Sequence, residues 1–218
     1  MQYSRVDAGS GKIECCGVIL GMASNERLEK AFTTFDAYNA NDPNKDTFEG
    51  KTYPKELLYA MRMTERLDRF APTAGEHVKL AARSQHIGRW EIVRSSYPMD
   101  KKGYLQWRNA EKLHQAKIAE QVLNSCRYEQ EMVDKVKFLL LKKELQSNAD
   151  TQLLEDVICL VFIEFYLEAF AAKHEDDKVV DILRKTLKKM SPRAIEEAGK
   201  IPVPQKIGGL IQKAVTVS

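Results

Sequence analysis

Three titratable side chains interrupt segments that are otherwise apolar, and they are the first candidates for chemistry. Glu56 opens a predicted helix over residues 54–70, His86 ends a predicted helix over 75–88, and Asp156 lies in the most hydrophobic segment. A buried carboxylate is costly without a partner, so Asp156 needs a cation, a histidine or a metal ion. If these helices pack together, Glu56, His86 and Asp156 converge in the core, where they can hold a divalent Mn, Mg, Fe or Zn ion.

Each of these residues also has a simpler explanation. His86 can be a structural histidine that hydrogen-bonds one carboxylate, or a general acid or base that works without a metal. Asp156 can form a buried salt bridge with Arg83 or Arg62. Glu56 can be a first-turn acid that interacts favourably with the helix dipole. The sequence leaves these alternatives open.

Basic and aromatic residues alternate in the connection after the third predicted helix. Arginine side chains match phosphate oxygens, and aromatic faces stack on planar rings. The residues expected to bind a substrate are Arg83, Arg89, Trp90, Arg94, Tyr97 and His114. Lys142, followed by Lys143, suits a phosphate group as well. A small phosphorylated molecule is therefore the expected partner, and the alternative is a solvated loop whose aromatic residues cover the end of the bundle.

Helical periodicity accounts for most of the chain after residue 22. Predicted helices begin near Ser24 and then cover residues 54–70, 75–88, 107–122, 129–143, 152 onward, 178–190 and a short final stretch from 192. Turn residues at 36–44 precede a loop that contains Gly50, and no stretch alternates with the period of a β-strand. The sequence predicts an all-α fold with a single helical domain over residues 23–218, preceded by a poorly ordered extension over residues 1–22.

Composition and missing motifs argue against several functions. A net charge of +3 is too small to indicate a nucleic-acid-binding protein. The apolar stretch 153–172 contains four acids, each costing roughly 2.5–3.5 kcal/mol at the bilayer centre, so no membrane span is expected. No Walker A, GxGxxG, GxSxG or HExxH motif is present, and no organic cofactor is expected.

The four cysteines form no CxxC pair, which favours reduced thiols and a cytoplasmic location. An organellar presequence within residues 1–22 is the alternative. The sequence does not predict an oligomeric state.

Residues 81–88 resemble a segment of the HD-type metal-dependent phosphohydrolases, in which an apolar run leads to His-Asp-Ile-Gly. Gln85 stands where that histidine would be, and His86 stands where the aspartate would be. Glu56 occupies the position of the family's first histidine, whereas Asp156 keeps the family's residue type.

This resemblance implies an orthogonal helical bundle like the HD-domain fold. It also implies a metal held by Glu56, His86 and Asp156 that activates a water to hydrolyse a small phosphorylated metabolite or nucleotide. The candidate catalytic residues are then Gln85, His86, Asp156 and Lys142. Because the His-Asp pair is replaced, a non-catalytic helical binding module with a degenerate metal site is the alternative.

A narrower resemblance covers residues 28–215. The motifs that carry it are Phe35–Asn44, Glu56–Met63, Arg83–Ile92, Tyr97–Asp100 and Leu154–Phe162. Over this range the chain closely resembles the family called domain of unknown function 4202. That resemblance implies no particular activity.

Overall fold

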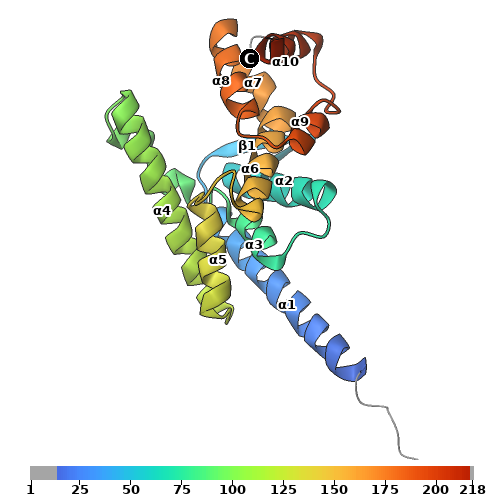
Figure 1. The fold of residues 1–218 in the computed structure, drawn as a ribbon. Helices are drawn as coiled ribbons and strands as arrows, with labels where there is room; N and C mark the ends of the chain where they lie inside the picture. The colour runs from blue at the N-terminus through green and yellow to red at the C-terminus, as the bar shows by residue number, and fades with distance from the viewer. Residues whose placement is uncertain (1–13, 217–218) are drawn as a thin grey trace, which may run out of the picture.

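The computed structural model describes the backbone of residues 14–216 and the side chains of residues 25–216. Helices make up most of it, with one small hairpin (Figure 1). The elements are α1 (Glu14–Asn39), β1 (Lys45–Phe48), β2 (Lys51–Pro54), α2 (Lys55–Phe70), α3 (Glu76–Ser84), the 3-10 turns η1 (Arg89–Glu91) and η2 (Arg94–Ser96), α4 (Lys101–Ser125), α5 (Gln130–Leu140), α6 (Ala149–Val161), a π-helical turn η3 (Phe162–Tyr166), α7 (Leu167–Ala171), α8 (Asp176–Leu187), α9 (Pro192–Ala198) and α10 (Gln205–Thr216). The predicted all-α class is confirmed, and the likeness to the HD-domain fold stays a prediction.

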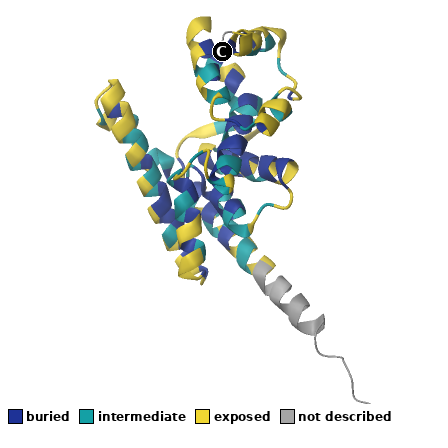
Figure 2. Cartoon of the chain, viewed as in Figure 1, coloured by how far each residue is buried: buried dark blue, intermediate teal, exposed yellow. Residues whose placement is uncertain are grey.

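The short helix α3 lies at the centre of the fold, where it packs against α1, α2, α5 and α6. Its Val78, Leu80, Ala81 and Ala82 are fully buried, and the two alanines allow neighbouring helices to approach closely. Figure 2 shows buried residues gathered where these helices meet, while the outer end of α4 is exposed. The chain that leaves α3 therefore starts from the middle of the molecule.

The hairpin β1–β2 is a correction, because a loop was expected there. The strands pair antiparallel across a two-residue turn, in which Glu49 and Gly50 have φ of 49° and 74°. Positive φ at both positions is what such a tight hairpin requires. Just before the hairpin, the Asp42 carboxylate accepts a 2.9 Å hydrogen bond from the backbone N–H of Glu56. The predicted turn segment thus fixes the first turn of α2.

Two predicted helix starts in the second half of the chain are confirmed. The Asn148 side chain caps α6 by accepting hydrogen bonds from the N–H groups of Asp150 and Thr151, at 3.1 and 2.9 Å. Ser191 caps α9, and Pro192 follows at the first helical position. α9 packs against α6, and α8 packs against α10. α10 was not predicted, since the helix from residue 192 was expected to be the last.

Helix α1 begins at Glu14, earlier than the predicted start near Ser24. Residues 14–22 of the predicted extension are therefore helical, and residues 1–13 lie outside the described part of the chain. The domain limits stay a prediction. Between residues 14 and 216, no helix combines the length and the apolar composition that crossing a membrane requires.

Candidate functional site

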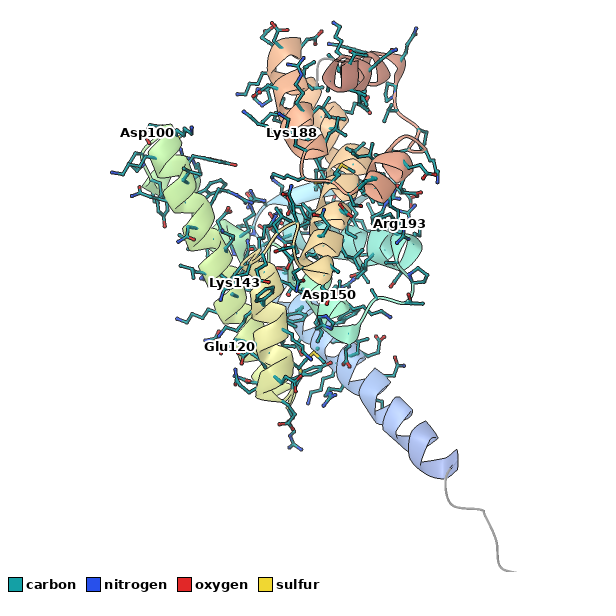
Figure 3. All side chains as sticks on the ribbon, in the orientation of Figure 1. Asp100, Glu120, Lys143, Asp150, Lys188 and Arg193 are labelled. Carbon is teal, nitrogen blue, oxygen red and sulfur yellow. The ribbon has the colours of Figure 1, made fainter. Side chains whose placement is uncertain are left out.

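A pocket of ≈ 520 Å³ lies among α2, the end of α3, α4, the α6–α7 segment and the end of α8. Figure 3 shows many side chains in this region, below the outer end of α4 at Asp100 and the end of α8 at Lys188. The volume is within the range of sites that hold small molecules. Predicted site residues Glu56, His86 and Lys142 all contribute to the lining.

Glu56 and His86 form the titratable pair of this pocket. Glu56 Oε2 lies 3.5 Å from His86 Nδ1, and the imidazole stacks on Tyr59 with ring centroids 4.2 Å apart. The Arg89 Nη1 atom lies 3.1 and 3.0 Å from the two ring nitrogens. A guanidinium can only donate, so the imidazole that faces it accepts and is neutral.

The pKa values of this pair shift in opposite directions, and each shift favours the neutral form. Burial raises the pKa of Glu56 to about 7, although the positive charge of Arg89 opposes that rise. Burial, followed by the charge of Arg89, lowers the pKa of His86 well below its ordinary value. Near neutral pH, Glu56 can therefore either give or take a proton, whereas His86 stays neutral.

One buried carboxylate orients two arginines of the pocket. Glu111 Oε1 lies 3.0 Å from Arg89 Nε, and its Oε2 accepts a 3.0 Å hydrogen bond from Arg108 Nη1. The Glu111 side chain is 0% exposed, whereas Arg89 and Arg108 are 29% and 28% exposed. A single negative charge is thus shared by two guanidinium groups that both reach the pocket.

A second carboxylate orients two lysines in the same way. Glu155 Oε2 accepts a 2.5 Å hydrogen bond from Lys142 Nζ, and Glu155 Oε1 lies 3.4 Å from Lys189 Nζ. Burial opposes the charge of Glu155, but attraction to Lys142 and Lys189 is stronger and lowers its pKa overall. Burial lowers the pKa of Lys142, although Glu155 favours its charged form.

Two residues of the pocket have a backbone conformation that most side chains avoid. His86 has φ of 66° and Lys142 has φ of 53°, both in the left-handed region. Glu49, Arg127, Glu144 and Gln146 share this conformation outside the pocket, so positive φ alone does not mark the site.

The structure corrects the role of Asp156. Its Oδ1 accepts a 2.8 Å hydrogen bond from the backbone N–H of Ser191, and its Oδ2 accepts a 2.5 Å bond from the Ser191 hydroxyl. Gln152 Nε2 donates a third bond of 2.9 Å. Asp156 therefore anchors the cap of α9 and does not line the pocket. Neither predicted salt-bridge partner is used, because Arg83 pairs elsewhere and Arg62 lies 3.7 Å from Asp46.

The donor set does not fit the predicted metal site. Glu56 and His86 are together, but Asp156 is bound to Ser191 on another face of α6. The nearest acid on that helix, Glu155, is already occupied by two lysines. Among the side chains of residues 25–216, no group of three or more His, Cys, Asp and Glu residues is placed to hold a metal ion.

Gln85 is the other candidate catalytic residue that stays outside the pocket. Its side chain is 2% exposed, and its backbone N–H closes the last turn of α3 by bonding to the Ala82 carbonyl. Its Oε1 atom has no hydrogen-bond partner within the described part of the chain. The chemistry predicted for Gln85 therefore has no access to a ligand in this pocket.

Two of the predicted substrate arginines make internal contacts. Arg83 pairs with Asp36 through Nε and Nη2, at 2.8 and 2.5 Å, which ties α3 to α1. Arg94 Nη1 donates a 3.1 Å hydrogen bond to the Tyr97 carbonyl, and its guanidinium lies 5.9 Å from the centre of the Trp107 ring. These contacts favour a structural role for both arginines.

The other predicted substrate residues hold the connection against α1 and α4. Trp90 packs on Tyr38 with centroids 6.0 Å apart. Glu91 accepts hydrogen bonds from the Tyr38 hydroxyl at 2.8 Å and from His114 Nε2 at 2.7 Å. Trp90, Arg94, Tyr97 and His114 do not line the pocket, and Arg89 is the one predicted substrate residue that does.

Sequence reasoning missed three quarters of the lining as site residues, twelve of the sixteen. The missed members are Lys55, Tyr59, Tyr104, Arg108, Glu155, Ile158, Cys159, Phe162, Tyr166, Phe170, Thr186 and Lys189. Part of the signal was present, because Ile158, Phe162, Tyr166 and Phe170 recur every four residues. Cys159 is not a ready nucleophile, since burial raises its thiol pKa to about 12.

Comparison with known proteins identifies the family and nothing more specific. The model of the family described as Domain of unknown function (DUF4202) matches residues 29–211. The chain belongs to this family, as the motifs in its sequence indicated. No curated protein and no solved structure matches the chain.

Proposed function

We propose that the central pocket binds the phosphate group of a small phosphorylated metabolite or nucleotide. The observation that carries this proposal is the excess of positive charge in the lining. Five cationic side chains line the pocket together with two carboxyl groups, Glu56 and Glu155. The cations are Lys55, Arg89, Arg108, Lys142 and Lys189. Guanidinium and ammonium groups are the side chains that best match phosphate oxygens.

The two shared carboxylates keep these cations oriented without neutralising them. Glu111 carries one negative charge against Arg89 and Arg108, and Glu155 carries one against Lys142 and Lys189. Each group of three therefore retains one positive charge for a ligand. Orienting the cations before binding also lowers the entropy that binding would otherwise cost. A phosphate group that carries up to two negative charges matches the two positive charges that remain, one from each group.

The reaction that the Glu56–His86 pair supports is hydrolysis of a phosphate ester. Protonated Glu56 donates a proton to the leaving alkoxide and regains one from the water that adds to the phosphorus. Neutral His86, whose Nδ1 lies 3.5 Å from Glu56 Oε2, adds no positive charge beside the acid that would favour its ionised form. The cations of the pocket stabilise the charge on the transferred phosphoryl group. No step passes through a metal, because the donor set does not fit one.

The test is calorimetric titration of the full chain with inorganic phosphate and with ribose 5-phosphate. Both are expected to bind, and Lys142→Gln is expected to weaken both about 10-fold, as loss of one charge-assisted contact does. Lys143→Gln is the matched control, since Lys143 is the exposed neighbour outside the pocket lining. The proposal fails if neither compound binds, or if the two lysine variants bind alike.

Release of inorganic phosphate separates the hydrolase from a binding module. Hydrolysis is supported if the wild type releases phosphate from ribose 5-phosphate and Glu56→Gln stops release while binding remains. Binding without any release identifies the same pocket as a non-catalytic module with a degenerate site.

A further inference from the structure

The helix that forms one wall of the pocket presents a row of apolar side chains. Ile158, Phe162, Tyr166 and Phe170 follow one another at intervals of four residues, and all four line the pocket. In a straight α-helix, four residues rotate by about 400°, which is about 40° more than one full turn. Over three such steps the side chains of the first and last residues would come to point about 120° apart. A regular helix could not aim all four at one ligand.

The π-helical turn η3 corrects this divergence. It spans Phe162–Tyr166, between α6 and α7, and takes more residues per turn than an α-helix does. The extra residue turns the row back toward the pocket, and Ile158, Phe162, Tyr166 and Phe170 are all half-buried. Leu160, Ile163 and Leu167 lie between them and are 0%, 4% and 0% exposed.

We infer that Phe162, Tyr166 and Phe170, the aromatic wall, hold a planar aromatic or heteroaromatic ring of the ligand. The inference rests on the proposed phosphate-binding function, because it assigns the other half of the same pocket. The ligand is then a phosphate monoester whose ring and phosphate group are close enough together to fit into the same pocket. Single π-turns inside α-helices are frequent at functional sites, which agrees with this use of η3.

The arrangement of the rings suits this ligand class. Phe162 and Phe170 meet edge to face, with centroids 6.0 Å apart and planes at 70°. Such pairs attract an added ring in an offset or edge-on position. Tyr104 lines the pocket from α4 and is 47% exposed, so its ring is available to cover a ligand. The cations Lys142 and Lys189 line the same cavity and would receive the phosphate.

The test compares three minimal probes in calorimetric titrations: phenyl phosphate, cyclohexyl phosphate and methyl phosphate. Phenyl phosphate is expected to bind about 5-fold more tightly than cyclohexyl phosphate, since aromatic pairs contribute beyond the area that they bury. Phe170→Leu is expected to remove this preference and to leave the affinity for inorganic phosphate unchanged. Phe165→Leu is the matched control, because Phe165 belongs to η3 but packs on Phe48 and Arg62 outside the lining.

The outcomes separate the two proposals. Equal binding of phenyl and cyclohexyl phosphate overturns the ring assignment and leaves phosphate binding intact, as does a preference that Phe170→Leu and Phe165→Leu reduce alike. If no phosphate compound binds at all, both the ring assignment and the proposed function are overturned.

Discussion

The central pocket and the connection over residues 90–100 both contain cationic and aromatic side chains but use them differently. In the connection, Arg94 donates to the Tyr97 carbonyl, and Glu91 accepts from Tyr38 and His114. Each of these polar groups is paired within the protein. In the pocket, single carboxylates are shared between pairs of cations, so positive charge remains for a ligand.

The difference shows that charge in a sequence does not reveal charge that a ligand can use. The connection has Trp90, Arg94 and Tyr97 close together in sequence, and its partners come from α1 and α4. The pocket draws single cations from α2, from α4 and from the segments that follow α3, α5 and α8, which are distant in sequence. Free charge therefore depends on how many opposite charges the fold supplies.

The largest expected effect is on stability and comes from Asp156, whose carboxylate accepts three hydrogen bonds within the protein. Asp156→Ala removes three acceptor contacts to Ser191 and Gln152, and leaves the N–H and the hydroxyl proton of half-buried Ser191 without their acceptor. We expect the free energy of unfolding to fall by about 4 kcal/mol, as measured by urea denaturation. Affinity for ribose 5-phosphate should not change in the folded fraction. If the variant had wild-type stability but did not bind phosphate, Asp156 would have to act in ligand binding and not in stabilising the fold.

The next largest effect is a pH dependence of the free energy of unfolding, which arises because Glu56, unlike Glu155, has a raised pKa. The pKa of Glu56 is raised from 4.5 to about 7, so the folded protein holds a proton that the unfolded chain releases between these values. The stability from this proton is fully present below pH 4.5 and is lost as the pH rises through 7, a change of roughly 3 kcal/mol.

Glu56→Gln imitates the protonated form and should remove that loss. Urea denaturation at pH 5 and pH 8 is expected to show the variant more stable than the wild type at pH 8, with a smaller difference at pH 5. Identical pH profiles for the two proteins would contradict the burial of a raised-pKa carboxyl group.

The fold class was predictable because helical periodicity and capping residues act locally. Asn148 and Ser191 each cap a helix that the sequence placed correctly. The hairpin was missed because its strands have only four residues each, too few for a clear alternation. The start of α1 was also missed, because the glycines at 17 and 21 indicated that no helix extends there.

The site was predicted only in part, for a reason that Glu155 and Asp156 illustrate. Both are buried acids on α6, and adjacent residues of a helix point about 100° apart. The sequence favoured Asp156, but Glu155 reaches the pocket while Asp156 turns toward α9. Only the packing of neighbouring helices decides between them. Glu56, His86 and Lys142 line the same pocket, and their predicted roles stay predictions.

The most direct test of the account compares two arginines that share a neighbour. The guanidinium groups of Arg94 and Arg108 lie 5.9 and 6.0 Å from the centre of the Trp107 ring, but only Arg108 lines the pocket. Arg108→Gln is expected to weaken ribose 5-phosphate binding about 10-fold, while Arg94→Gln leaves it within about 2-fold of the wild type. Equal losses in the two variants, or a loss confined to Arg94→Gln, would contradict the assignment of free charge to the pocket.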